Sequence, residues 1–483
     1  MIFKIKPIKK RNLVFYFANL LSAFLLMSET TIVIKPFILV LLSFLMIPNP
    51  LSFIPMLFVS SWSITFVAFP GLAAYFYYLV MFFVSIGVSL VFNKEKKVVS
   101  FVPGIPAARM ALLFAIWISI TGFYSVSGQW YDAVKLALFI VPLILVSRLR
   151  LSNMEFCRTS IDIIAVFFSV YCLYIMYFSP AYYYTATMSQ RSIRSDMNPN
   201  TASQIVLVLF TILYSEMFRT KKYWLLIFAA LNAGTLMYLG SRTAFFTMAI
   251  ITIVYLMVVL KTAIWKKILL FIVFLALFFV LFSLGSGMGR SDRLTLETIE
   301  EDQGSGRFYT WDVLYHEVIP YHLVHGVGVG KANYENLPIF ALDADNLYLD
   351  LLTATGIVGL LLFFAYYISN LRHLFRYRKK KRDWDSLIAI FLAQLFEGIG
   401  ETVYDIPIIW FFGFLSMLAI NDLKYAEDAP ERNQTWNLLW KFPKNWLYHI
   451  ITLIIKDFLS CIYIRLIIFG FTICYAGFLQ NSV

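Results

Sequence analysis

The sequence DNLYL (345–349) closes a polar stretch that runs from 287 to 350 between two long apolar runs. The same stretch contains GRFYTW (306–311) and HGVGVG (325–330), and the apolar run that follows it carries TGIVGL (355–360). Apolar runs of this kind are long enough to cross a membrane as helices. A polar stretch of similar length stays outside the hydrocarbon layer. We therefore expect one large loop held between two membrane helices.

The composition predicts a membrane protein. Hydrophobic residues make up 60% of the 483 residues, aromatic residues 18% and charged residues 14%, whereas a soluble chain is about 45–50% apolar. The net charge of +12 comes from short basic clusters between apolar runs, without a base-reading motif, so no nucleic-acid partner is expected. The four cysteines lack C-x-x-C spacing, which indicates neither a disulfide framework nor a zinc site.

A spanning helix needs about 20 apolar residues, and this length predicts an all-α polytopic membrane protein of about 12–15 spans. The whole chain, 1–483, is expected to form a single integral membrane domain. The basic N-terminus and the apolar run after it, without a cleavage site, predict an uncleaved first helix with a cytoplasmic N-terminus. Pro48-Asn49-Pro50 either ends two helices or kinks one. The candidate spans are 13–34, 36–47, 51–69, 71–92, 110–124, 131–146, 161–178, 202–217, 224–239, 243–260, 268–284, 347–368, 386–400 and 406–420, with a further one near 458–479.

Basic connectors at alternate ends of successive spans indicate the sides of the membrane. The positive-inside rule assigns the clusters at 94–97, 148–150, 219–222, 261–267 and 372–382 to the cytoplasm, together with a connector at 422–446. The connectors 179–200, 240–242, 287–346 and 401–405 then face the other side. The large loop, 287–346, occurs once, which weighs against the duplicated halves common in secondary transporters.

Two of the outer connectors carry arginine beside the start of a helix. Arg242 follows Ser241, which can cap that helix, and a helix N-terminus with an arginine suits a phosphate. An arginine that only anchors the membrane surface is the alternative. Asn198-Pro199-Asn200 is a second capping sequence, preceded by Arg191 and Arg194, so Arg194 either assists in anion binding or belongs to a plain basic loop.

The large loop supplies candidates of both charges. Arg307 and Trp311 are four residues apart and would share a helix face, where a guanidinium binds phosphate and an indole offers a face to a sugar or to lipid. Asp345 and Asn346 stand at the capping position of the next helix, which does not exclude a role in the site. The glycine run at 326–330 lacks the strand and acidic residue of a nucleotide site, so tight loop packing is expected.

Glu397 and Glu401 are candidate carboxylates outside the loop. Their spacing of four residues predicts a shared face of one membrane span whose outer end is near Glu401. A carboxylate inside a membrane costs roughly 2.5–3.5 kcal/mol on insertion scales. Glu397 therefore needs a partner or a wet cavity, and is either half of an ion pair with arginine or a general base.

The order of these motifs resembles the O-antigen polymerase and ligase family, over roughly 191–362. The resemblance implies a metal-independent glycosyltransferase without a cofactor, which uses undecaprenyl-diphosphate-linked glycans as donor and acceptor on the periplasmic side of the bacterial inner membrane. The ligase branch usually has His-Asn where this chain has Asp345-Asn346. This departure favours a polymerase of O-antigen, capsule or exopolysaccharide. Membrane lipid and a chain-length regulator protein are candidate partners.

The resemblance also suggests roles for the candidate residues. A sugar hydroxyl of one lipid-linked repeat would attack the anomeric carbon of another, which requires positive charge on the leaving diphosphate and a carboxylate as base. The expected substrate-binding residues are Arg194, Arg242, Arg307, Trp311 and Asn346, and the candidate bases are Asp345, Glu397 and Glu401. An O-antigen ligase acting on the lipid A core is the alternative within the family. A flippase or other transporter of lipid-linked oligosaccharides shares the composition, but should place its charges deep in the bundle and lack a long outer loop.

Overall fold

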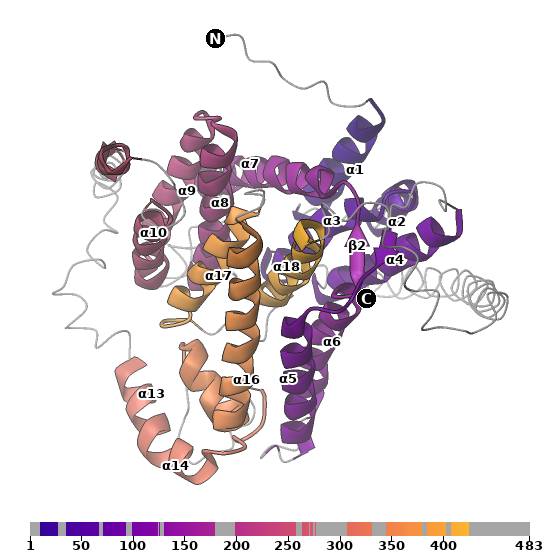
Figure 1. Cartoon of the computed structure of the whole chain (residues 1–483). Helices are drawn as coiled ribbons and strands as arrows, with labels where there is room; N and C mark the ends of the chain where they lie inside the picture. The colour runs from indigo at the N-terminus through magenta and orange to yellow at the C-terminus, as the bar shows by residue number, and fades with distance from the viewer. Residues whose placement is uncertain are drawn as a thin grey trace, which may run out of the picture. The chain divides into compact units, whose positions relative to one another are not determined.

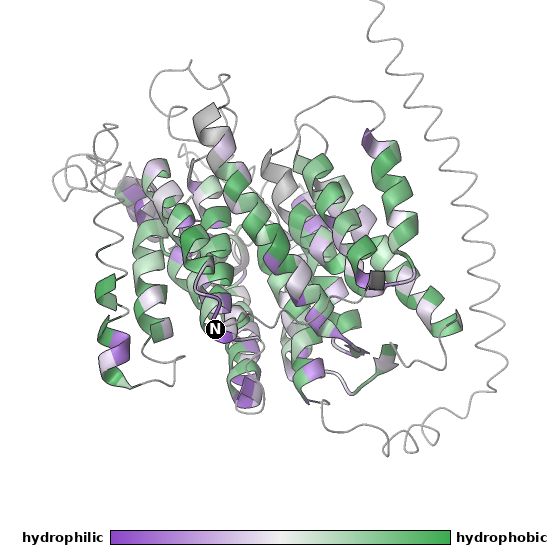
Figure 2. Ribbon diagram, turned by 90° about the horizontal axis from the view of Figure 1, so that it is seen from above, coloured by the Kyte–Doolittle hydropathy of each residue, from purple (hydrophilic) through white to green (hydrophobic). Residues whose placement is uncertain are grey.

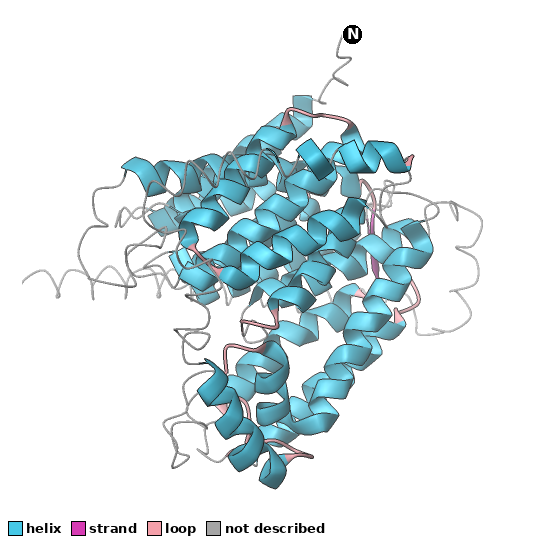
Figure 3. Cartoon of the chain, turned by 90° about the vertical axis from the view of Figure 1, so that its left-hand side faces the viewer, coloured by secondary structure: helices cyan, strands magenta, loops and turns pink. Residues whose placement is uncertain are grey.

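The computed structural model of the chain describes residues 10–27, 35–66, 71–92, 99–123, 125, 130–178, 199–256, 263–269, 271–273, 276, 307–330, 344–378, 384–401 and 407–424. Helices dominate this part of the chain, with one short two-stranded sheet among them (Figure 3). The all-α fold class expected from the sequence is confirmed.

The elements follow the apolar runs of the sequence. In the first half these are α1 (Lys10–Met27), α2 (Lys35–Met46), the 3-10 turn η1 (Pro50–Ser52), α3 (Phe53–Phe66), α4 (Gly71–Phe92), β1 (Val99–Phe101), α5 (Pro106–Phe123), α6 (Tyr131–Val146), β2 (Leu149–Leu151), α7 (Met154–Phe178) and α8 (Pro199–Thr220). The second half contains α9 (Leu225–Leu239), α10 (Arg242–Val254), α13 (Arg307–Val313), the π-helical turn η7 (Leu314–Val318), α14 (Ile319–His322), α16 (Leu347–Arg378), α17 (Asp385–Glu397) and α18 (Pro407–Lys424). Pro48-Asn49-Pro50 therefore separates two helices.

Five of these helices, α4, α5, α8, α16 and α18, contain stretches long and apolar enough to cross a membrane. Shorter apolar helices occur in α1, α2, α3, α9 and α10. Hydrophobic residues occupy most positions of the helices drawn in Figure 2. The multi-pass membrane character is thereby supported. The expected span near 458–479 and most of the one at 268–284 lie outside the described residues.

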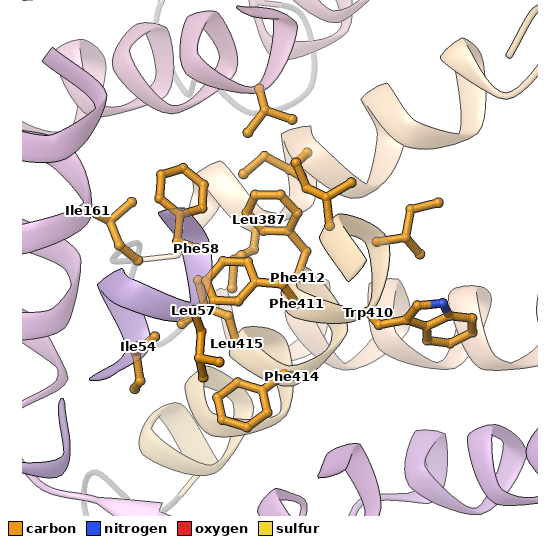
Figure 4. Packing of buried hydrophobic residues seen from close by; sticks show 14 of the residues in the cluster. Ile54, Leu57, Phe58, Ile161, Leu387, Trp410, Phe411, Phe412, Phe414 and Leu415 are labelled. Atoms are coloured by element: carbon orange, nitrogen blue, oxygen red, sulfur yellow. The ribbon is translucent and has the colours of Figure 1, made fainter. Parts of the chain in front are cut away.

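The core is built around α18, in which nearly every side chain is buried. Phe411 and Phe412 lie 5.5 and 6.0 Å from Phe58 of α3, measured between ring centroids (Figure 4). On another side of α18, the Trp410 ring lies 6.0 Å from Phe114 of α5. Aromatic rings at these separations attract one another beyond the effect of burial. α18 thus packs against two helices from the first third of the chain.

α16 is broken at Gly356, whose φ of 69° and ψ of −177° interrupt the helical backbone. A helix break frees carbonyl groups that need other donors. Three N–H groups from other segments donate hydrogen bonds to these carbonyls. The Val327 N–H bonds to Thr353 at 2.8 Å, and the Gly328 N–H bonds to Ala354 at 3.0 Å. The Trp117 indole N–H bonds to Thr355 at 2.7 Å. The glycine-rich loop is thereby bonded to the membrane helix that follows it.

Two glycines allow this close contact between loop and helix. A Cβ atom on Gly326 would lie 2.3 Å from the Ala354 carbonyl oxygen, and one on Gly356 would lie 2.2 Å from the Val324 carbonyl oxygen. Both residues also have positive φ angles, 72° and 69°, which favour glycine. The tight loop packing predicted for the glycine run is confirmed.

Candidate functional site

Arg307, the first residue of α13, forms ion pairs with two carboxylates from other segments. Its Nε donates to Asp345 Oδ2 at 3.1 Å, and its Nη2 donates to Glu401 Oε1 at 2.9 Å. The Asp345 side chain is 37% exposed and the Glu401 side chain only 7%. We call these three residues the Arg307 cluster. Because its members are 38 and 94 residues from Arg307 in the chain, the cluster ties the large loop to the end of α17.

The residues that precede α16 are held at three consecutive positions. The Trp311 indole donates to the Ala344 carbonyl at 2.6 Å, Arg307 holds the Asp345 carboxylate, and the Asn346 side-chain amide donates to the Ile399 carbonyl at 2.9 Å. Asp345 has a φ of 44°, in the left-handed region that aspartate tolerates better than most residues. The backbone and side chain of Asp345 are therefore fixed from both sides.

Asn346 is the N-cap of α16. Its Oδ1 accepts the backbone N–H groups of Tyr348 and Leu349, each at 3.0 Å, and the Leu347 N–H donates to the Gly398 carbonyl at 2.7 Å. The capping position expected for Asp345-Asn346 is confirmed, with Asn346 as the capping residue. The first amides of α16 are consequently already bonded within the protein, which leaves them unavailable to an anion.

Arg242 begins α10, which follows α9 after a turn at Gly240 and Ser241. Ser241 occupies the N-cap position, but its side chain makes no capping hydrogen bond, so the expectation that it caps through its hydroxyl is wrong. The neighbouring Thr243 packs against the end of α17, since a Cβ atom on Gly400 would lie 2.1 Å from the Thr243 Oγ1 atom. Gly400 directly precedes Glu401, so the start of α10 lies next to the Arg307 cluster.

Glu397 and Glu401 do not share one helix face. α17 ends at Glu397 with Gly398 as its C-cap, and the chain then turns, so the prediction that both carboxylates lie on one span is wrong. Glu397 is 4% exposed, and its Oε1 atom has no hydrogen-bond partner among the described residues. The arginine of the site pairs with Glu401 instead.

Two arginine candidates, metal binding and the loop histidines remain to be placed. Arg191 and Arg194 lie outside the described residues, although α8 does begin at Pro199 as the capping sequence predicts. Within the described ranges, no group of three or more His, Cys, Asp or Glu residues is arranged to hold a metal ion. His322 lies in the loop near His325, and partial burial together with this neighbour lowers the pKa of His322.

Sequence reasoning missed the contacts that complete the site. The Trp117 indole of α5 donates a hydrogen bond to a carbonyl at the break in α16. The Gly398 and Ile399 carbonyls accept hydrogen bonds from residues at the start of α16. Trp117 lies in an apolar run, where an indole is ordinary. Gly398 and Gly400 were the available signal, because two glycines just before Glu401 allow a helix to end and its backbone to approach other segments.

These observations define a polytopic helical membrane protein in which a polar loop and the ends of three helices meet around paired charges. Residues 226–364 match a family model described as O-antigen ligase. This match confirms the resemblance to the O-antigen polymerase and ligase family and supports a function of the polymerase or ligase type in general. It does not separate the two branches. The matched region includes Arg242, Arg307 and Asp345, and it ends before α17. No curated protein matches the chain.

Proposed function

We propose that this protein is a polysaccharide polymerase that joins undecaprenyl-diphosphate-linked oligosaccharide repeats on the periplasmic side of the bacterial inner membrane. The observation that carries this proposal is the Arg307 cluster, because it holds a partly exposed carboxylate, Asp345, at the junction of the loop and a membrane helix. Asp345 also stands where the ligase branch usually has histidine, so this chain offers a different proton acceptor.

Asp345 fits the role of general base better than the other two carboxylates. A base must come within about 2.6–3.2 Å of the hydroxyl that it deprotonates. Glu397 and Glu401 are almost completely buried, whereas Asp345 is more than one-third exposed. Arg307 then acts as a positioning residue, with Glu401 balancing its charge. Trp311 assists by holding the Ala344 carbonyl beside the base, and Asn346 by fixing the backbone after it.

Arg242 is the residue that we assign to the donor diphosphate. Arg242 is the first residue of α10, and the Ser241 side chain does not cap this helix. A helix N-terminus attracts an anion. Arg307 faces two carboxylates, which reduce its attraction for a further anion. A guanidinium at the start of α10 can bind two phosphate oxygens and stabilise the charge of the leaving group. Arg194 is proposed to assist.

The reaction then proceeds as a displacement at the anomeric carbon of the donor. The acceptor hydroxyl oxygen forms the new glycosidic bond, and its proton passes to the Asp345 carboxylate. The bond between the anomeric carbon and the diphosphate oxygen breaks, and its electron pair leaves with undecaprenyl diphosphate, held by Arg242. The proposal requires neither a metal ion nor a nucleotide.

An O-antigen ligase is the second candidate, because the matching family model carries that description. The acceptor separates the two: a polymerase uses a lipid-linked repeat, and a ligase uses the lipid A core. Deleting the gene for a polymerase should leave single repeats on the final carrier and abolish the ladder of longer chains. Loss of all glycan from that carrier, with long lipid-linked chains accumulating, would establish the ligase.

A further inference from the structure

Glu397 is a buried carboxyl group that the proposed reaction does not use. Its side chain is 4% exposed, and its Oε1 atom has no hydrogen-bond partner among the described residues. No Lys or Arg side chain of these residues forms an ion pair with Glu397, and Arg307 pairs with Glu401 instead. An unpaired charge in such a site is strongly disfavoured, and a carboxyl group avoids this cost by keeping its proton.

The position of Glu397 in its helix also disfavours a charge. Glu397 is the last residue of α17, and the C-terminal end of a helix carries partial negative charge that repels an anion. The Glu401 carboxylate, four residues later, is close enough to repel a charge on Glu397 as well. Both effects act in the same direction as burial and favour the neutral acid.

The surroundings of Glu397 supply more negative than positive charge. α17 lies between α10 and α16 in Figure 1, and α8 and α18 also pack against it. α8 and α18 carry their titratable side chains in their last two turns, toward the predicted cytoplasmic side and away from Glu397. Tyr348 and Tyr367 of α16 donate hydrogen bonds to the Leu395 carbonyl and to the Gln394 side chain. The charged groups that remain nearby are Arg242, Arg307, Asp345, Asp350 and Glu401.

Three carboxylates thus already accompany two guanidinium groups in this region. A charged Glu397 would add a fourth carboxylate, which opposes the binding of a diphosphate. The proposed function therefore requires an uncharged Glu397 for the same reason that burial favours it.

The turn that follows Glu397 holds the residues beside Asp345. The Gly398 carbonyl accepts the Leu347 N–H, the Ile399 carbonyl accepts the Asn346 side-chain amide, and Glu401 pairs with Arg307. The turn begins at Glu397 itself, whose carbonyl accepts the Gly400 N–H at 3.0 Å. A charge on Glu397 would therefore act on the segment that positions Asp345.

We propose that Glu397 is a neutral carboxylic acid at neutral pH and a positioning residue for transfer. Its proton leaves Arg307 bound to Asp345 and Glu401 alone. When the proton is lost in alkaline solution, the new carboxylate repels Glu401 and attracts Arg307, so Asp345 loses the contact that fixes it. The inference rests on the proposed function for the role of Asp345, whereas the protonation of Glu397 does not depend on it.

The protonation state is measured by infrared spectroscopy of the full-length protein in lipid nanodiscs at neutral pH. The difference spectrum between the parent protein and Glu397→Gln should contain the C=O stretch of a protonated carboxylic acid, which shifts in heavy water. Glu401→Gln is the matched control, because Glu401 is ion-paired, and its difference spectrum should contain carboxylate bands instead. Loss of carboxylate bands in Glu397→Gln, without an acid band, would overturn the proposal.

The positioning role is measured by the rate of chain elongation between about pH 6 and about pH 10, an interval in which buried glutamates ionise. The rate of the parent protein should fall about tenfold per pH unit above the ionisation of Glu397. Glu397→Gln cannot ionise and should keep at least about half of its own neutral-pH rate over this interval. Equal pH profiles in the two proteins would overturn the positioning role. An acid band in a protein that does not polymerise would support the neutral Glu397 and count only against the proposed function.

Discussion

Replacing Gly356 by alanine tests how the large loop is attached to the membrane helix. The new Cβ atom would lie 2.2 Å from the Val324 carbonyl oxygen, a backbone atom that cannot swing away as a side chain can. The backbone angles of Gly356, φ 69° and ψ −177°, belong to a region occupied almost only by glycine. Such strain costs about 1–3 kcal/mol, and overpacking adds about 1–3 kcal/mol.

Relief of this clash would have to move the loop or the helix. Both are fixed nearby, since the Ile357 N–H donates to the Leu323 carbonyl at 2.8 Å. We therefore expect Gly356→Ala to lower the free energy of unfolding by about 2–6 kcal/mol. The measurement is thermal unfolding in nanodiscs together with the rate of proteolysis within the loop. Transfer activity should fall as well, because the same loop carries Arg307.

Gly87→Ala in α4 provides the control. A Cβ atom on Gly87 would meet nothing within 4 Å, and alanine is favoured over glycine inside a helix by about 1 kcal/mol. This variant should melt at or slightly above the temperature of the parent protein. If Gly356→Ala has the same melting temperature and the same rate of proteolysis as Gly87→Ala, the loop is not held by close packing at the break in α16.

Three further predictions follow from single contacts and from charge. Arg242→Lys should lose at least about tenfold in transfer rate at normal protein level, because lysine keeps the charge without the planar fork; full activity in both the lysine and the alanine variant would reduce Arg242 to a membrane anchor. Asn346→Ala should lower the free energy of unfolding by about 1–2 kcal/mol through loss of the cap, measured by thermal unfolding, and an unchanged melting temperature would contradict the capping role. A reporter enzyme fused after Gly330 should be active only outside the cytoplasm and one fused after Arg378 only inside, and the reverse result at either point would undo the assignment of sides.

Much of the fold was predictable from the sequence, because the length of an apolar run is a direct signal in a membrane protein. The bounds of α4 and α6 are those of the apolar runs at 71–92 and 131–146. The start of α16 at Leu347 was also predictable, since Asn346 is a strong capping residue.

The break inside α16 and the end of α17 were not predictable in the same way. TGIVGL reads as a continuous apolar helix, and the break at Gly356 depends on hydrogen-bond donors that arrive from the loop and from Trp117. Helical spacing placed Glu397 and Glu401 on one helix, whereas α17 ends at Glu397 and Glu401 lies beyond the turn that follows.

The candidate site shows the same limit. The sequence identified Arg307, Asp345 and Glu401 individually, by residue type and by their position in outer connectors. It gave no means of pairing Arg307 with a carboxylate 94 residues away, nor of choosing Glu401 over Glu397. Glu401 follows the end of α17, and this end packs against α10, which is a property of the folded bundle.

The polymerase function is tested most directly by transfer with the purified protein in lipid nanodiscs, supplied with undecaprenyl-diphosphate-linked repeat as both donor and acceptor. We expect a ladder of lipid-linked chains that grows with time and is lost in Asp345→Asn, whose side chain keeps its shape but cannot take the proton. A ladder of unchanged rate in Asp345→Asn, or elongation only when a lipid A core acceptor is added, would refute a polymerase with Asp345 as its base.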